Sequence, residues 1–498
     1  MFGLLTQAQT LQLAVVLPLI GGVAVLWLGE RNRNLRETAS LVTAALEFAL
    51  VASLTGSVMH GERPSVELFE MMPGLTITLT VEPLGMLFAL IASGLWIVNT
   101  VYSIGYMRKN NEQNQTRFYI CFTIAISSAV GIAFAGNLLT LFVFYEILTI
   151  STYPLVTHSG KIEAIRGGRV YLGILMSTSI GFLLLAVLWT YNATGTLDFT
   201  AGGILGDRIQ GPEVAALMFL YMFGIGKAAL MPIHHWLPAA MVAPTPVSAL
   251  LHAVAVVKAG VFSVVKVIVY IFGLDMLVTS DWDNWLLYIA GFTIISASVV
   301  ALRQDNLKRR LAYSTVSQLG YVIMAAAILA PLSIIGAAMH IVAHAFGKIT
   351  LFFAAGAIYT ASKKTMVSQL DGIGRRMPFT MAAFAIGALS MIGLPPTVGF
   401  VSKWYIVGGA LEMESYFAVA VIVASTLLNA SYFLPIIYAA FFKHEKPREG
   451  NDTHPTHDNH GEAPVAMVLA LCVTAFGTLA LFFMPEAPLA LSRALVGG

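Results

Sequence analysis

The sequence predicts an all-α, polytopic membrane protein with about fourteen transmembrane helices. Its 498 residues are 57% hydrophobic and only 11% charged, with a mean hydropathy of +0.79, which is far more apolar than an ordinary soluble domain. The apolar stretches reach the roughly 20 residues that a helix needs to span a bilayer. They also lack the alternating pattern of a transmembrane barrel strand, so helices are expected rather than a barrel.

Fourteen stretches along the chain are apolar and long enough to be such helices. They cover residues 11–29, 37–57, 82–105, 118–136, 138–157, 169–192, 213–240, 246–272, 284–302, 310–330, 332–360, 378–410, 415–442 and 463–484. The chain starts with "MFGLLTQAQT", which has no basic residue, and the first stretch continues beyond signal-peptide length. We therefore expect no cleavable signal peptide.

Basic residues fall on one side of the predicted bundle. Twenty of the 28 Lys and Arg residues lie in the loops that follow the odd-numbered spans, whereas the opposite loops hold only Arg63, Arg208 and Arg493. By the positive-inside rule the basic loops face the cytoplasm and both termini face outward. We expect a multi-pass protein of a bacterial or archaeal-type cell (inner) membrane, in contact with the lipid bilayer.

Ionisable residues within the predicted spans are the main functional signal. Two are acids, Glu47 and Glu146, and five are lysines. The lysines are Lys227, Lys258, Lys266, Lys348 and Lys403. An ionisable group at membrane depth costs about 2.5–3.5 kcal/mol on insertion scales and is a functional candidate by default.

Two of these residues have equally good structural explanations. Lys266 lies near the outer end of its span, where its ammonium group could extend to the interface. Glu47, alone in "TAALEFALVAS", could be a packing or partner-contact residue. The other four lysines lie in apolar surroundings far from an interface, so a functional role is favoured for them.

Groups of this kind can form a proton relay. Buried lysines, carboxyl groups and histidines exchange protons near neutral pH, because desolvation disfavours their charged forms. In "HIVAHAFGK", His340, His344 and Lys348 are spaced i, i+4, i+8 and share one helical face. The alternative is a set of hydrogen bonds that only holds neighbouring helices together. His252 and Lys258 differ by roughly 240° around an ideal helix, so they are expected to face different neighbours.

Prolines predict two broken helices. Pro232 frees the carbonyl of Ala228, next to Lys227, and Pro238 frees that of His234. Irregular backbone at membrane depth is tolerated where it lines a cavity or is packed in protein. We therefore expect a hydrated site beside the lysine at each break, Lys227 here and Lys403 at the second.

The second break lies in "GLPPTVGF". Its two prolines free the carbonyls of Met391 and Ile392, shortly before Lys403. Two interrupted helices five spans apart are typical of inverted-repeat transporters. The predicted divisions are N-terminal helices in 1–117, a first five-helix unit in 118–272, a second in 284–442, and a histidine-rich loop with the last helix in 443–498.

Several longer motifs occur in order between the third and thirteenth spans. They are "FVFYEILTISTYPLV", "GIGKAALMPIHHWLP", "APTPVSALLHAVAVVKAG", "HAFGK" and "GLPPTVGFVSKW". Together they resemble the antiporter-like subunits shared by Mrp-type multisubunit Na+/H+ antiporters, respiratory complex I and membrane-bound hydrogenases.

The resemblance implies a proton channel with assigned residues. Glu146 and Lys227 would form the switching pair, Lys258 the central connection and Lys403 the exit. The residues implied between them are His252, His340, His344 and Lys348. The partners implied are other integral membrane subunits, and the transported ion is the proton; whether sodium also moves is left open.

One departure concerns the cytoplasmic side of the channel. After "WLP", many relatives have an acid and a histidine, whereas this chain has Ala239, Ala240 and Met241. His234 and His235 supply polarity nearby and are candidate uptake residues.

The features together favour a D-like member of the Mrp-type antiporter subunits. Lysine at position 403, where one complex I type has glutamate, argues against that type and favours an Mrp D-like subunit or the smaller complex I-like subunits. The alternative is an antiporter-like component of a complex I-type NADH:quinone oxidoreductase or a hydrogenase. An organic solute transporter and an assembly scaffold are weaker alternatives.

No cofactor, catalytic residue or nucleic-acid partner is expected. Cys121 and Cys472 are isolated, and no phosphate-binding loop motif occurs. His454, His457 and His460 lie in the polar stretch "EGNDTHPTHDNHGE", which favours a flexible loop over a metal site. Any redox chemistry would therefore belong to partner subunits.

Overall fold

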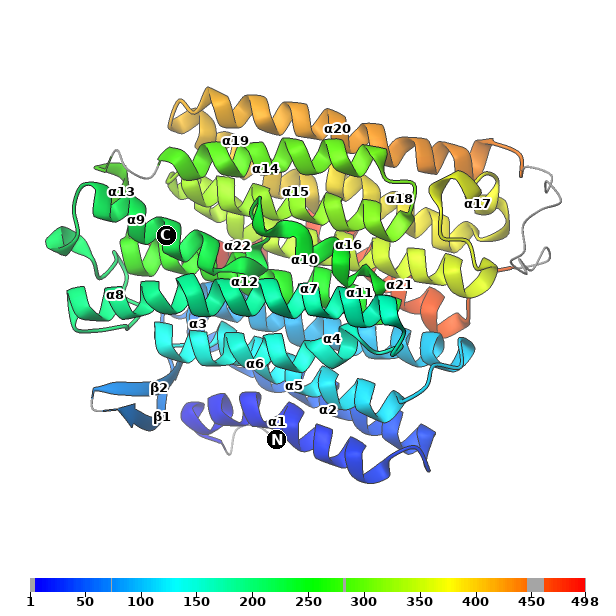
Figure 1. Cartoon of the computed structure of the whole chain (residues 1–498), viewed down its shortest axis with the longest axis horizontal. Helices are drawn as coiled ribbons and strands as arrows, with labels where there is room; N and C mark the ends of the chain where they lie inside the picture. Colours follow the sequence, from blue (N-terminus) through cyan, green and yellow to red (C-terminus); the bar gives the residue numbers. More distant parts are fainter. Residues whose placement is uncertain (1–4, 73, 281–283, 446–460, 498) are drawn as a thin grey trace.

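The computed structural model describes residues 5–72, 74–280, 284–445 and 461–497, without the side chains of Met72, Asp207 and His252. Long helices lie nearly side by side, with a β-hairpin at one end of the bundle and α17 at the other (Figure 1). The all-α membrane class is therefore confirmed. The histidines at 454, 457 and 460 lie outside the described residues.

The N-terminal part contains eight α-helices, one π-helical turn (η2) and the hairpin. Their bounds are α1 (Gln7–Leu28), α2 (Arg33–Ser53), α3 (Thr55–Met59), β1 (Ser65–Met72), β2 (Leu75–Thr80), α4 (Pro83–Lys109), α5 (Gln115–Ala133), α6 (Leu138–Val156), α7 (Ile162–Thr178), η2 (Ser179–Leu183) and α8 (Leu184–Thr194).

The middle of the chain is the most irregular part. Its elements are η3 (Gly206–Arg208), α9 (Pro212–Gly224), η4 (Gly226–Ala228), η5 (Ile233–His235), α10 (Trp236–Ala239), η6 (Ala240–Val242), α11 (Thr245–Ala249), η7 (Leu250–Val254), α12 (Val256–Val267), η8 (Ile268–Phe272) and α13 (Leu274–Val278). The η7 and η8 segments are π-helical, whereas η3 to η6 are short 3₁₀ turns.

The remaining elements are mostly long helices, with the short η9 and α17 among them. They are α14 (Asn284–Arg303), α15 (Leu307–Ala327), α16 (Pro331–Ser362), η9 (Val367–Gln369), α17 (Ile373–Arg376), α18 (Pro378–Ile392), α19 (Val398–Glu412), α20 (Tyr416–Phe442), α21 (Val465–Phe483) and α22 (Glu486–Arg493).

Within the described residues, ten helices are long and apolar enough to cross a membrane. The other predicted spans fall on segments that are interrupted or shorter: 213–240 on α9 to α10, 246–272 on α11 to η8, and 378–410 on α18 and α19. The span 310–330 corresponds to the polar-ended α15. Both predicted helix breaks are confirmed, while the count of fourteen and the division into repeats stay predictions.

The β-hairpin is an element that the sequence patterns did not predict. β1 and β2 pair antiparallel, with Ser65 opposite Thr80 and Glu67 opposite Thr78. The hairpin lies in the predicted loop between the second and third spans, and alternation in "LTITLT" was its signal. It is a small two-stranded cap, so the helical class is unaffected.

Helix α16 forms the centre of the bundle. It packs against α15, α18, α19 and α21, and it also touches α4, α11 and α12. In its most apolar stretch 94% of the residues are buried, against 39% in the corresponding stretches of the peripheral α1 and α20 (Figure 1). Polar side chains on α16 therefore meet protein on all sides.

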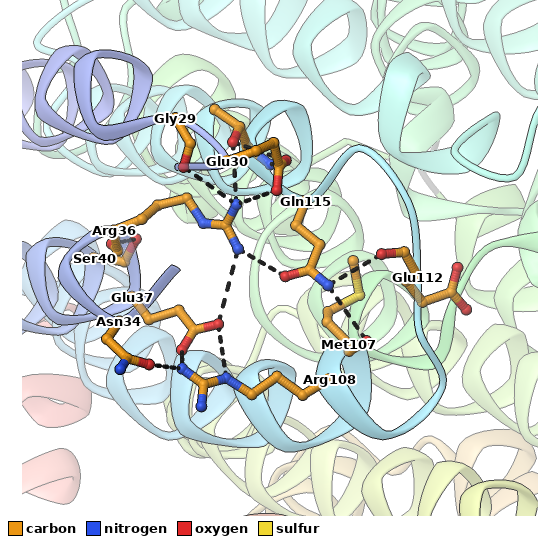
Figure 2. A network of polar contacts seen from close by, with 11 residues as sticks. Gly29, Glu30, Asn34, Arg36, Glu37, Ser40, Met107, Arg108, Glu112 and Gln115 are labelled. Carbon is orange, nitrogen blue, oxygen red and sulfur yellow. Dashed lines mark hydrogen bonds and ion pairs between the residues drawn. The ribbon is translucent and has the colours of Figure 1, made fainter. Parts of the chain in front are cut away.

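A network of charged side chains ties the first helices together at the Lys/Arg-rich end (Figure 2). The fully buried Arg36 donates to Glu30 at 2.8 Å and to Gln115 at 2.7 Å. Arg108 of α4 pairs with Glu37 of α2. Because each guanidinium bridges different segments, the network fixes α2 and α4 relative to the start of α5.

Glycine allows α12 to lie directly on the broken segment η4. A Cβ atom at Gly260 would collide with the amide nitrogen of Ala228 and the carbonyl carbon of Lys227. The helix that carries Lys258 is thus in backbone contact with the turn that carries Lys227.

This contact predicts that Gly260→Ala lowers the thermal stability of the purified protein. The added methyl group must displace backbone rather than a flexible side chain, and overpacking of this kind costs about 1–3 kcal/mol. The matched control is Gly173→Ala in α7, where a Cβ atom meets nothing within 4 Å. Thermal unfolding in detergent should show a lower Tm for the first variant only; equal Tm values would contradict the close contact.

Candidate functional site

All five lysines of the predicted spans are buried in protein. Four side chains are 0% exposed and Lys403 is 6% exposed. They lie on η4, α12, α16 and α19, around the centre of the bundle. The burial of Lys227, Lys258, Lys348 and Lys403 agrees with the expectation that these four lie far from an interface.

Lys227 is held by α6. Its Nζ donates to the carbonyl oxygen of Tyr145 at 2.8 Å and to Oγ1 of Thr149 at 2.6 Å. The ammonium group also stands 3.0 Å from the centroid of the Tyr145 ring. The Tyr145 hydroxyl in turn accepts the backbone amide of Lys227 at 3.0 Å, which fixes the broken segment against α6. Every partner is neutral, so this charge is stabilised by dipoles and a ring face.

Glu146 follows Tyr145 directly on α6. Its carboxylate oxygens are buried and have no hydrogen-bond partner among the described residues. No ion pair within 4.0 Å joins it to Lys227 in this part of the chain. The structure therefore places the proposed switching pair on adjacent segments, with the two charges not in direct contact.

Lys403 lies at the second helix break. Its Nζ donates to the carbonyl oxygens of Ile392 at 2.7 Å and Met391 at 3.3 Å, and to Oγ1 of Thr426 at 3.2 Å. These are the two carbonyls that the sequence predicts to be free, because α18 ends at Ile392 before the prolines. The Tyr321 ring lies 4.8 Å from the ammonium group.

Lys348 repeats the same arrangement on α16. Its Nζ donates to Oγ of Ser314 at 2.6 Å and to the carbonyl oxygen of Leu311 at 3.2 Å, with the Phe433 ring 5.7 Å away. Each of these three lysines therefore has at least one carbonyl, one hydroxyl and one aromatic ring. The sequence does not show this pattern, because the acceptors come from other helices.

Lys258 differs from the other lysines because its partner is titratable. Its Nζ lies 2.6 Å from Nδ1 of His344, across the contact between α12 and α16. The expectation that Lys258 bridges to something other than His252 agrees with this pair. The side chain of His252 lies outside the described residues, and its backbone is in the π-helical η7.

His340 continues the polar contacts along α16. Its Nδ1 lies 2.9 Å from Oγ of Ser402, and its Nε2 lies 3.1 Å from Oε1 of Gln318. Lys258 therefore contacts His344 and His340 contacts Ser402, while the ring centroids of the two imidazoles are 6.4 Å apart and Ser402 directly precedes Lys403 on α19.

Lys266 is paired with an acid that was not among the predicted membrane-buried residues. Its Nζ lies 3.1 Å from Oε2 of Glu82 and donates to the carbonyl oxygen of Ala135 at 2.6 Å. The side chain is 0% exposed, so the interpretation that it extends to the interface is wrong. Glu82 is the first residue of the third predicted span, next to Pro83. A residue at a span boundary is not expected to be buried, so the sequence did not single it out.

The candidate uptake residues lie beside the first break. His234 is buried near His235, with ring centroids 4.1 Å apart, and near Tyr313 at 6.1 Å. His235 is exposed at the surface of the bundle. The two imidazoles are thus adjacent, but His234 is buried and His235 is exposed.

Glu47 remains apart from these groups. It is 0% exposed, and its oxygens have no hydrogen-bond partner among the described residues. No cluster of three or more potential metal-ligating side chains occurs in the described ranges.

Comparison with known proteins gives the family. The profile described as NADH:quinone oxidoreductase/Mrp antiporter, TM matches residues 135–429. NADH-quinone oxidoreductase subunit N of Desulforudis audaxviator is 33% identical over 423 residues, which cover 83% of this chain and 83% of that protein.

Two longer relatives are matched over part of their length. A probable K(+)/H(+) antiporter subunit of Rhizobium meliloti is 32% identical over 82% of this chain and 41% of its own length. NAD(P)H-quinone oxidoreductase chain 5 of Synechocystis sp. is 30% identical over 81% of this chain and 62% of its own length.

Solved structures share the fold over nearly the whole chain. A chain of the Mrp complex from Dietzia sp. has a TM-score of 0.87 at 22% identity, covering 99% of this chain and 97% of that one. A chain of the membrane-bound sulfane sulfur reductase, an archaeal respiratory membrane complex, has a TM-score of 0.84 at 24% identity, covering 99% and 98%. The resemblance of the sequence motifs is thereby confirmed: this chain is a member of the NADH:quinone oxidoreductase/Mrp antiporter family of membrane subunits.

Proposed function

We propose that this chain moves protons across the membrane as the D-like component of an Mrp-type multisubunit cation/proton antiporter. The observation that carries the proposal is the buried series from Lys258 through His344 and His340 to Ser402 and Lys403. Titratable groups that follow one another at membrane depth, with two of the steps at hydrogen-bond distance, suit a proton relay.

The first step of the relay is assigned to Glu146 and Lys227. Lys227 is held by neutral acceptors, so its charge is sensitive to any nearby carboxylate. Movement of Glu146 toward Lys227 would favour the protonated lysine, and movement away would favour release. Gly260 brings the backbone of α12 against Lys227, which places Lys258 on the next element along the relay.

The second step passes from α12 to α16 and α19. A proton on Lys258 is shared directly with Nδ1 of His344, which lies 2.6 Å away. His340 is hydrogen-bonded to Ser402, which precedes Lys403, the assigned exit at the second helix break. Lys348 lies two turns from His340 on the same helix and is assigned as a side store for a proton. His252, His234 and His235 remain assigned to transfer and uptake.

A second host complex is also favoured by a specific observation. The relative from Desulforudis audaxviator is named as part of an NADH-quinone oxidoreductase and matches this chain over similar lengths of both proteins. The same relay would then be driven by redox subunits of a complex I-type enzyme or hydrogenase.

Co-purification in mild detergent tests the host complex. We expect several small hydrophobic partner subunits and no flavin, because an antiporter is driven by an ion gradient. Flavin- or nickel–iron-containing partners would instead place the chain in a redox-driven pump. Recovery of an isolated chain that takes up an organic solute in proteoliposomes would contradict both hosts.

Replacing the first lysine should stop proton movement. Lys227→Met and Glu146→Gln are each expected to reduce proton translocation by about a hundredfold or more, because each removes a proton-exchanging group. A pH-sensitive dye in membrane vesicles measures this, and co-purification checks that the complex still assembles. The control is Lys109→Met, at an exposed position at the end of α4; unchanged transport in Lys227→Met would contradict the proposal.

Two further variants separate a relay from a scaffold. Lys258→Met should abolish transport and lower stability less than Lys266→Met does, because it leaves an imidazole short of one hydrogen bond rather than a carboxylate without its counter-charge. Lys266→Met should instead lower stability by about 3 kcal/mol, because it leaves Glu82 buried and unpaired. If Lys258→Met disrupts assembly but keeps the transport rate of the remaining complex, the buried groups serve as a scaffold.

A further inference from the structure

A polar recess opens at the Lys/Arg-rich end of the bundle. Its volume is about 340 Å³, and it lies between the α4–α5 loop, the start of α7, the η6–α11 segment and the start of α15. Its charged lining residues are Glu112, Lys161, Glu163, Lys308 and Lys364. It also borders Met241, at the end of the stretch where the sequence lacks the polar residues of many relatives.

Glu112, Lys308 and Lys364 are the partly buried charges of this recess, and Lys364 is paired with Glu445 at 3.1 Å. Lys308 donates to the carbonyl oxygen of Ala243 at 2.6 Å, which holds the ammonium group at the start of α11. Burial raises the pKa of Glu112, and the positive charges of Lys161, Lys363 and Lys308 oppose that shift. A carboxyl group of this kind, in reach of bulk water, can collect protons nearer to neutral pH than an exposed one.

The inner wall of the recess leads to two hydroxyl groups. Tyr106 and Thr245 both line it. One turn deeper, the Tyr102 hydroxyl donates to the carbonyl oxygen of Phe353 at 2.8 Å. A Cβ atom at Gly356 would collide with both the Tyr102 hydroxyl and Thr245, so both of these side chains lie directly against that glycine.

Two buried polar side chains continue in the same direction. Asn99 and Ser248 are both 0% exposed. Neither polar atom of the Asn99 amide, nor Oγ of Ser248, has a hydrogen-bond partner among the described residues. Buried groups of this kind are normally satisfied, and water satisfies those that protein does not.

Helical spacing aligns these groups with the recess. Asn99, Tyr102 and Tyr106 are spaced i, i+3, i+7 and share one face of α4. Thr245 and Ser248 are spaced i, i+3 on α11, which packs against α4 and continues through η7 into α12 and Lys258. The polar stripe therefore leads from Glu112 toward the centre of the relay.

We propose that this recess takes up protons and that Tyr106, Thr245, Ser248 and Asn99 line a water-filled route from Glu112 to Lys258. The proposal rests on the proposed proton translocation and adds an uptake path that bypasses His234 and His235. In each transfer Glu112 releases a proton to the water chain, the amine of Lys258 receives one, and bulk water reprotonates Glu112. No bond other than O–H, N–H and hydrogen bonds is made or broken.

Thiol accessibility tests the route without measuring transport. Ser248→Cys is introduced into a background in which Cys121 and Cys472 are replaced by serine, so that it is the sole thiol. A small cationic methanethiosulfonate reagent should modify it about tenfold faster from the Lys/Arg-rich face than from the opposite face of oriented vesicles. Ser263→Cys is the matched control: it is 0% exposed on α12, and its hydroxyl is already bonded to the carbonyl oxygen of Ala259.

The outcomes of this labelling decide the route. Faster modification of the cysteine at 248 from the Lys/Arg-rich face, with the cysteine at 263 inert, supports it. Absence of modification, equal rates from both faces, or equal rates at both positions overturns it.

Transport assays provide the second arm. Glu112→Gln and Asn99→Leu should each slow proton translocation by about tenfold, because a proton donor or a water ligand is lost. Thr100→Val is the matched control for Asn99, since the Thr100 hydroxyl only bonds the carbonyl oxygen of Trp96 in its own helix. If Lys227→Met abolishes transport but Glu112→Gln and Asn99→Leu do not slow it, the route fails while the relay stands. If Lys227→Met leaves transport intact, the relay itself fails.

Discussion

A lysine ammonium group below the membrane surface needs acceptors, and the helices of a bundle have few carbonyls to spare. Four of the five buried lysines obtain one from the backbone. The pairs are Lys227 with Tyr145, Lys266 with Ala135, Lys348 with Leu311, and Lys403 with Ile392. At the second break the interrupted backbone meets this need directly, because the end of α18 frees the carbonyls of Met391 and Ile392 that Lys403 reaches. The acceptor of Lys227 lies instead on α6, against which the broken segment η4 packs.

Close helix contacts are the second consequence. Gly260 lets α12 touch the η4 backbone, and Gly399 lets α19 touch the carbonyl of Ser390 at the end of α18. A side chain at Gly399 would push α19, which carries Lys403, away from its acceptors on α18, and one at Gly260 would push α12 off the η4 backbone. Small residues at the breaks therefore bring backbones close together, as they do in membrane helix packing generally.

The lysines differ in the kind of partner that holds them. Lys266 forms a buried ion pair with the carboxylate of Glu82. Lys227, Lys348 and Lys403 are held by neutral groups, and Lys258 by an imidazole. A charge that is balanced by dipoles alone can be lost or gained without leaving an unpaired opposite charge behind, and that property suits a relay.

Much of this protein was determined by local sequence. Hydropathy predicts the helices because each span must bury its own backbone, and the prolines predict both interruptions and even the carbonyls, Met391 and Ile392, that accept from Lys403. The spacing of His340, His344 and Lys348 likewise places them on one buried face of α16. The motifs carry the family resemblance over most of the chain.

Only the tertiary structure decided which groups meet. The pairing of Lys258 with His344, the acceptors of Lys348 on α15 and the Glu82–Lys266 ion pair all join segments distant in the chain. The π-helical η7 also changes the angle between His252 and Lys258 around the helix axis from the value expected for an ideal α-helix. Burial and backbone breaks act locally along the chain and can be read from it. Hydrogen-bond and ion-pair partners depend instead on which helix faces pack together, and small residues and shape complementarity across the whole bundle determine that packing.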